Sequence, residues 1–243
     1  MKTYGLIGNP VAHSFSEKYF SEKFEKEEIN AEYKLFKLED LTEFQDLLKK
    51  EKNLKGLNVT SPFKEKIFPF LDEIEEQAQN IGAVNTIKFE DGRRIGYNTD
   101  SFGFLKSLFP IIEKQHTDAL ILGTGGAAKA IAQALKSMGI DYQMVSRTPA
   151  ENQIAYTDLT AEIIKENLLI VNCTPLGTYP NVEESPNIPY EGLTKKHLLY
   201  DLTYNPVVTQ FLAQGQMREC KVFNGQKMLE FQAERSWEIW NEK

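Results

Sequence analysis

Lys64 and Asp100 are two side chains of opposite charge, at positions where they could take part in proton transfer. Residues Gly56–Thr60 predict a strand, and Lys64 follows it directly after a Ser61-Pro62 turn. Ligands of α/β proteins bind beyond the carboxyl ends of strands, so Lys64 is a candidate acid/base, although a lone lysine is otherwise an ordinary solvated charge. Asp100 precedes a predicted helix over Ser101–Leu108, where an acid stabilises the helix start; its alternative role is to orient a lysine ammonium.

Two hydroxyls stand at another predicted helix start. Ser14 and Ser16 precede apolar residues with helical spacing, and Ser14 with Glu17 has the spacing of a capping box. The serines therefore serve as a helix cap, or they hold a substrate carboxylate beside the helix N-terminus. The spacing alone favours the cap.

A glycine turn near the middle of the chain predicts a nucleotide site. Ala119–Leu122 is an apolar run of strand length, and Ala127–Met138 is rich in helix formers. Between them stand Gly123, Thr124, Gly125 and Gly126, which let a backbone approach a ligand closely. Strand, glycine turn and helix together are typical of a dinucleotide site, with a pyrophosphate on the helix N-terminus; an ordinary turn packed with glycines is the alternative.

The residues after the next strand favour NADP over NAD. An acid near the end of that strand, Tyr142–Val145, usually binds the ribose 2′-hydroxyl of NAD. Here the sequence is Ser146-Arg147-Thr148, and a guanidinium suits a 2′-phosphate. Cys173, after a later strand, is better explained as a small buried residue than as a nucleophile, because no histidine lies nearby in sequence.

The elements that position these residues predict an α/β fold with two domains. The chain has 243 residues, and the glycine turn leaves a complete domain's length before it. Expected strands and helices alternate before the turn, and further buried strands follow it. These expected elements include strands at Thr3–Gly8, Tyr33–Leu38, Ile81–Ile87, Arg94–Tyr97, Leu168–Val171 and Leu198–Tyr200, and helices at Leu41–Lys50 and around Met228–Trp240.

Composition narrows the possible partners and the compartment. The net charge is −7 with dispersed lysines, which argues against nucleic acid or an anionic membrane as a partner. The N-terminus shows no signal-peptide pattern and no apolar run reaches bilayer length, so we expect a cytoplasmic protein. Two cysteines are too few for a disulfide framework, and no spacing indicates a metal site.

Over nearly its whole length the chain resembles the shikimate dehydrogenase family. The resemblance is carried by the order and spacing of several segments. They are Gly8–Ser16, Asn58-Val-Thr60-Ser-Pro-Phe-Lys64, Gly82–Thr86, Gly96–Asp100, Gly123–Gly126, Asn172–Gly177, Asp201–Pro206, and Met228-Leu229 followed by Gln232.

The resemblance implies a two-domain fold, a substrate and a set of roles. An N-terminal α/β domain (1–101 plus 228–243) would bind shikimate, and a Rossmann-type domain (102–227) would bind NADP, with the substrate in the cleft between them. The activity would be the NADP-linked interconversion of 3-dehydroshikimate and shikimate, in aromatic amino-acid biosynthesis. Lys64 and Asp100 would form the catalytic pair, and Ser14 and Ser16 would hold the substrate carboxylate rather than act only as a cap. The remaining implied substrate residues are Asn58, Thr60, Asn85, Tyr204 and Gln232, and the implied cofactor residues are Gly123, Thr124, Gly125, Gly126, Ala127, Ser146, Arg147, Thr148, Thr174 and Gly225.

One departure from the family pattern leaves alternatives open. Glu151 stands where the family carries a second basic residue, and it would repel a 2′-phosphate, so NAD use is possible. The segment between Arg147 and Asn172 is also short for the family. The alternatives are an NAD-linked quinate/shikimate dehydrogenase and a non-catalytic sensor of NADP or shikimate. Monomer and homodimer are both compatible with the sequence.

Overall fold

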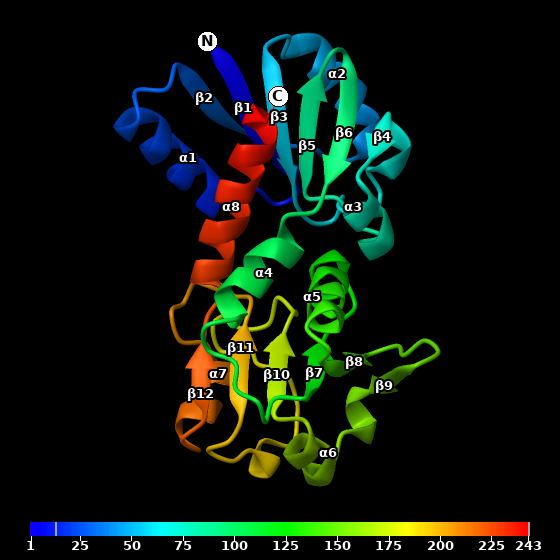
Figure 1. Cartoon of the computed structure of the whole chain (residues 1–243), viewed down its shortest axis with the longest axis vertical. Helices are drawn as coiled ribbons and strands as arrows, with labels where there is room; N and C mark the ends of the chain where they lie inside the picture. Colours follow the sequence, from blue (N-terminus) through cyan, green and yellow to red (C-terminus); the bar gives the residue numbers. More distant parts are fainter. Residues whose placement is uncertain (13, 243) are drawn as a thin grey trace. The chain divides into compact units, whose positions relative to one another are not determined.

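The computed structural model describes residues 1–12 and 14–242, so His13, inside the expected Gly8–Ser16 motif, lies outside the described residues. The chain divides into two compact units, Met1–Thr99 with Gln232–Lys243, and Asp100–Phe231. Each unit contains one six-stranded sheet (Figure 1). Among the helices of the described residues, none has the length and apolarity needed to cross a membrane.

The first unit is built on a mixed sheet with strand order β2-β1-β3-β5-β6-β4. Strands β1, β2 and β3 are parallel, whereas β5 pairs with β3 and β6 in the antiparallel direction. The strands are β1 (Lys2–Gly8), β2 (Ala31–Lys37), β3 (Leu54–Val59), β4 (Glu73–Ile74), β5 (Thr86–Glu90) and β6 (Arg93–Tyr97). The helices are α1 (Phe15–Lys26), α2 (Phe44–Lys50), α3 (Glu76–Ile81) and the C-terminal part of α8 (Gln226–Asn241).

Alternation along β1 places two hydrophobic cores on the two faces of this sheet. Tyr4 and Leu6 lie in one core with residues of α1 and α8, among them Trp240. Ile7 lies in the other core with residues of α2 and α3. Helices therefore cover both faces, as the period of two in a strand requires when both faces are buried.

The second unit is a six-stranded sheet with all strands parallel, in the order β12-β11-β10-β7-β8-β9 (Figure 1). This is the doubly wound arrangement expected of a dinucleotide-binding domain, with the strand order reversing between β7 and β10. The strands are β7 (Asp118–Leu122), β8 (Asp141–Ser146), β9 (Gln153–Ala155), β10 (Leu169–Asn172), β11 (Leu198–Asp201) and β12 (Lys221–Phe223). The helices are α4 (Asp100–Leu108), α5 (Gly126–Ser137), α6 (Ala161–Glu166), α7 (Gln210–Gln216) and the first turns of α8.

The central strands of this sheet are apolar at almost every position because both faces are buried. In β7, Ala119 and Ile121 join the core that contains α5, whereas Leu120 and Leu122 join the core that contains α6 and α7. The expected strand at Ala119–Leu122 and the expected helix after it are both confirmed. The predicted α/β class with two domains is also confirmed.

The strand expected over Ile81–Ile87 is wrong in its first half. Helix α3 ends at Ile81, where Gly82 forms the C-cap in a left-handed conformation with φ 73°. The buried residues Ala83 and Val84 then form a turn, held by a hydrogen bond from the Val84 amide to the Lys64 carbonyl of 2.8 Å. A short run of apolar residues is compatible with a buried strand and with a buried turn. The sequence pattern therefore predicted a strand where the chain forms none.

The crossover between β8 and β9 contains no helix. Residues 147–152 join the two parallel strands directly, with Asn152 at φ 64°. Parallel neighbours are usually joined by a helical connection. This missing helix accounts for the shortness of the segment between Arg147 and Asn172 that the sequence shows.

Candidate active site

Three of the substrate-side residues expected from the sequence, Asn58, Asn85 and Gln232, gather in one buried polar cluster of the first unit. Asn58 lies near the end of β3 and Asn85 precedes β5, and both are almost fully buried. The Asn58 amide nitrogen donates to the Asn85 carbonyl at 3.3 Å, and the Asn85 amide nitrogen donates to the Gln232 side-chain oxygen at 3.5 Å. The structure therefore brings together three residues that are 147 and 27 positions apart in sequence.

Thr99 joins the same cluster and holds the chain just before Asp100. Its amide donates to the Asn85 side-chain oxygen at 2.8 Å, and its hydroxyl donates to Gln232 at 3.4 Å. The neighbouring Asn98 amide nitrogen donates to the Ala83 carbonyl at 2.8 Å. These bonds fix the backbone that leads into α4, whose first residue is the buried Asp100.

The backbone of Lys64 is held by the segment that precedes Asn85. The Val84 amide donates to the Lys64 carbonyl at 2.8 Å, one residue before Asn85. Lys64 is half-buried, and it stands on the short turn after β3. Thr60 closes this turn by accepting a hydrogen bond from the Phe63 amide at 3.0 Å.

Ser236 is a member of the cluster that the sequence did not reveal. It lies one helical turn after Gln232 on α8 and is fully buried. Its hydroxyl lies 3.0 Å from the Asn58 amide nitrogen, 2.8 Å from the Thr86 hydroxyl and 3.2 Å from the Thr99 hydroxyl. A spacing of four residues places Ser236 on the same face as Gln232, and that spacing is the signal that would have identified it.

The two serines of the first helix take different places. Ser14 is the N-cap of α1 and accepts from the Ser16 amide at 3.2 Å, whereas the capping-box spacing predicts the amide of Glu17 as donor. Ser16 is buried and shares a hydrogen bond with the Tyr33 hydroxyl, which in turn donates to the Asn58 side-chain oxygen at 2.8 Å. Burial raises the pKa of Tyr33 far above its usual value, so this phenol stays protonated.

The glycine turn of the second unit has the geometry of an anion-binding site. Gly123 has φ 109°, a conformation that side chains disfavour, and its amide donates to the Val145 carbonyl at 2.9 Å. Gly125 is the N-cap of α5, with extended backbone and open space where a Cβ would stand. Thr124, Gly126 and Ala127 complete the turn, so the first amides of α5 can receive an anion.

The loop after β10 meets this turn at the point where strand order reverses. The Cys173 amide donates to the Leu122 carbonyl at 2.9 Å, and the Thr174 side chain lies close to Gly123. Thr174 donates to the Asn172 side-chain oxygen through its amide at 3.0 Å and its hydroxyl at 2.7 Å. Burial raises the pKa of the Cys173 thiol well above its usual value, which agrees with a packed thiol rather than a nucleophile.

A buried carboxylate ties this loop to the loop after β11. Asp201 accepts from the Asn172 amide nitrogen at 3.1 Å, the Thr203 amide at 3.0 Å and the Thr209 hydroxyl at 2.6 Å. Burial raises the pKa of Asp201, and these three donors oppose that rise. The network orders the start of the segment that carries Tyr204.

The remaining residues that the sequence predicts for the cofactor take the following positions. Ser146 is buried and accepts from the Thr148 amide at 3.1 Å, whereas Arg147 is exposed at the end of β8. Gly225 lies against Leu202, whose carbonyl oxygen would be 2.1 Å from a Cβ at that position. Close packing against Leu202 therefore explains the glycine at position 225, independently of any ligand.

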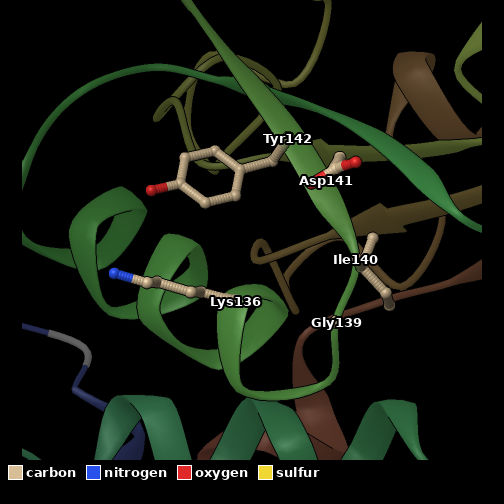
Figure 2. Close-up of a pocket in the computed structure, with 5 residues that line it drawn as sticks. All are labelled: Lys136, Gly139, Ile140, Asp141 and Tyr142. Carbon is tan, nitrogen blue, oxygen red and sulfur yellow. The ribbon is translucent and has the colours of Figure 1, made fainter.

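A pocket at the other end of the second sheet does not coincide with these residues. It is lined by Lys136, Ile140 and Tyr142, together with Gly139 and Asp141 (Figure 2). These residues stand at the end of α5 and the beginning of β8. Ligands of open parallel sheets bind beyond the carboxyl ends of the strands, so this pocket is not the dinucleotide site.

Known proteins match both the sequence and the fold. Residues 6–87 match the family model of the shikimate dehydrogenase substrate binding domain. The shikimate dehydrogenase (NADP(+)) of Clostridium botulinum strain Hall is 38% identical, over 99% of this chain and 96% of that protein. The crystal structure of shikimate dehydrogenase from Aquifex aeolicus has a TM-score of 0.89 and 36% identity, covering 99% of this chain and 92% of that one.

A further structure carries both ligands. Shikimate 5-dehydrogenase from Thermus thermophilus, in complex with NADP(H) and shikimate, has a TM-score of 0.88 and 32% identity, covering 99% of this chain and 94% of that one. The identity to the Clostridium botulinum enzyme over almost the full length, together with the matching fold, establishes the relationship. The chain belongs to the shikimate dehydrogenase family.

Proposed function

We propose that this protein is an NADP-dependent shikimate dehydrogenase that reduces 3-dehydroshikimate to shikimate in aromatic amino-acid biosynthesis. The first unit would bind the substrate, as domain 1–101 plus 228–243, and the second would bind NADP, as domain 102–227. The observation that carries this proposal is the buried cluster of Asn58, Asn85 and Gln232, which matches the family motifs and has hydroxyl-binding amides. The substrate is a small molecule, and we expect no nucleic acid among the partners.

The residues of the glycine turn fit the cofactor. Open space at Gly125 and the first amides of α5 suit a pyrophosphate, and Arg147 supplies a cation for a 2′-phosphate. When bound, NADPH supplies the hydride that reduces the substrate ketone. The side chains on this protein then have to orient the substrate and supply the proton.

Lys64 and Asp100 are the residues proposed for the proton transfer. Reduction of a ketone carbon leaves negative charge on its oxygen, which needs a proton and a cation nearby. The Lys64 ammonium would give its proton to that oxygen and regain one from water. Asp100 would orient the ammonium and accept a hydrogen bond from the new hydroxyl.

The other substrate residues would orient the ring. Ser14 and Ser16, beside the N-terminus of α1, would hold the carboxylate. Thr60, Tyr204 and the three amides of the buried cluster would bind or line the ring hydroxyls. Such positioning removes much of the entropic barrier of a reaction between two bound molecules.

The test is absorbance of the reduced nicotinamide, with shikimate or quinate and NADP or NAD in all four pairings. We expect turnover with shikimate and NADP. Turnover confined to quinate or NAD would instead support the catabolic enzyme that Glu151 leaves open. Shikimate that protects the fold against heat without any turnover would support the non-catalytic sensor.

Variants of two nearby lysines test the proton donor. Lys64→Ala should lose most turnover and still bind shikimate. Lys66, exposed on the same turn, is the control, and Lys66→Ala should keep normal turnover. Near-normal turnover in Lys64→Ala would refute the role of Lys64.

A further inference from the structure

A buried hydroxyl at the end of β9 has no role in the site described so far. Tyr156 is the first residue after β9, and its ring packs against the core that contains Val145 and Ile164. Its hydroxyl oxygen is buried and has no hydrogen-bond partner among the residues that the structure describes. Buried polar groups are nearly always hydrogen-bonded in native proteins, so this hydroxyl requires an explanation.

The register of the sheet places Tyr156 at the edge where dinucleotides bind. Ser146 pairs with Ala155, so Arg147 and Tyr156 are the first residues beyond the paired ends of β8 and β9. The Arg147 guanidinium and the Cys173 thiol, the first residue beyond β10, both act electrostatically on the Tyr156 hydroxyl. Tyr156 therefore stands at the carboxyl end of a strand in a doubly wound sheet, within electrostatic range of the residues that follow two other strands.

The missing crossover helix makes side-chain donors more important at this edge. The loop of residues 147–152 follows β8 in place of a helix, so no helix N-terminus follows Arg147 directly. Two amides of this loop are already used, because Thr148 donates to the Ser146 side chain and Ala150 to the Gln153 side chain. A ligand at this place therefore has fewer backbone amides to bind and gains from side-chain donors.

Tyr156 can serve as such a donor. Burial raises its pKa to about 12, against the opposing effect of the Arg147 guanidinium, so the phenol keeps its proton at neutral pH. The adenosine half of a dinucleotide offers acceptors in its ring nitrogens and ribose oxygens, and these groups suit a neutral donor.

We infer that the Tyr156 hydroxyl donates a hydrogen bond to the adenosine half of NADP(H) and helps to determine cofactor affinity. This inference rests on the proposed function, since it assigns one more residue to the proposed cofactor site. It also predicts a side-chain donor directly after β9, at an edge where the connection from β8 to β9 contains no helix.

The experiment compares Tyr156→Phe with wild type by calorimetric titration of three probes. NADPH and 2′,5′-ADP both contain the adenosine half, and nicotinamide mononucleotide contains the other half. We expect the Kd of the first two to rise roughly three- to tenfold and the Kd of the third to stay unchanged. Loss of an unpartnered hydroxyl should leave the melting temperature unchanged or raise it.

Tyr190→Phe is the matched control. Tyr190 packs against the same core, but its hydroxyl already donates to the Pro186 carbonyl at 2.7 Å. This variant should lower the melting temperature and leave the affinity for 2′,5′-ADP unchanged. Tyr156→Phe should change the affinity and not lower the melting temperature, whereas Tyr190→Phe should do the reverse. This contrast distinguishes a ligand contact from a structural hydrogen bond.

Two results would overturn the inference in distinguishable ways. Wild-type affinity of Tyr156→Phe for 2′,5′-ADP would show that the hydroxyl is only a buried polar group, and the proposed function would stand. Wild-type protein that binds neither NADPH nor 2′,5′-ADP would remove the proposed function, and the inference with it.

Discussion

Gly125→Ala separates the needs of the fold from the needs of a ligand. Gly125 has φ −75° and ψ −179°, a conformation open to any residue, and apart from its two chain neighbours no residue has an atom within 4 Å of the place of its Cβ. Nothing in the described residues therefore requires a glycine there. The backbone approach of a pyrophosphate would require one, because a methyl group would occupy the space over the first amides of α5.

The expected changes in folding free energy nearly cancel. Alanine is a poorer N-cap than glycine by up to about 1 kcal/mol. Alanine also restricts the unfolded chain, which stabilises the fold by about 0.4–1 kcal/mol. The melting temperature should therefore change by no more than roughly 3 °C.

The expected change in affinity is much larger. A hydrogen bond to a charged group contributes about 1.5–3 kcal/mol, so the loss of one amide–phosphate contact raises the Kd for NADPH by roughly 10- to 150-fold. Calorimetric titration with NADPH and thermal melting without ligand measure the two quantities. An unchanged Kd would refute the assignment of the turn to the pyrophosphate.

Gly123→Ala provides the contrast on the same turn. Gly123 has φ 109°, and a Cβ there would lie 3.4 Å from the Cys173 carbonyl oxygen. The strain should cost about 1–2 kcal/mol and lower the melting temperature of the protein without any ligand. Equal melting temperatures for the two variants would contradict the distinction between a glycine that the fold needs and one that the ligand needs.

Three further predictions concern charge and the buried cluster. Glu151→Lys should lower the KM for NADPH about fivefold and leave that for NADH nearly unchanged, because a repulsive charge four residues after Arg147 becomes attractive; initial rates with both cofactors measure this. Ser236→Ala should lower the free energy of unfolding by about 1 kcal/mol in urea titration and raise the KM for shikimate but not for NADPH. Asp72 makes two 2.7 Å hydrogen bonds with Arg94, which hold its pKa at about 2, below the unfolded value of 3.8. Its stabilising effect is present above about pH 4 and is lost as the pH falls toward 2, so Asp72→Asn should flatten the decline of stability over that interval, as thermal melts across it would show.

The sequence predicts the second unit better than the first. In β10 and β11 every position is buried, and in β7 every position after the first, so each strand contains an apolar run between loops. The mixed sheet of the first unit contains a two-residue strand, Glu73–Ile74, which is too short for any period to be visible. The connection of residues 147–152 is visible in the sequence only as a short segment, because its composition does not indicate which element is missing.

The buried cluster shows why the partners of Asn58 could not be read from the sequence. Its amide nitrogen donates to Ser236, 178 residues away, and its oxygen accepts from Tyr33 on β2. The Ser236 contact depends on how α8 packs on the first sheet, and the Tyr33 contact depends on the strand order β2-β1-β3; local patterns specify neither. Gln232 was noticeable because an amide interrupted an apolar stripe, whereas a serine at the next turn is common on any helix.

These partners also limit what Asn58 can do for a substrate. Its amide nitrogen already has the Asn85 carbonyl, the Thr86 hydroxyl and Ser236 within 3.0–3.3 Å. The two amide hydrogens of Asn58 cannot bond equally to these three acceptors and to a substrate hydroxyl. A substrate hydroxyl therefore has to displace one of the three partners, or it has to bind at the Asn58 side-chain oxygen beside Tyr33. The oxygen has a second lone pair, whereas displacement would break one of these buried hydrogen bonds. The contacts therefore favour acceptance by the Asn58 oxygen, with Ser236 and Tyr33 holding that oxygen in a single orientation.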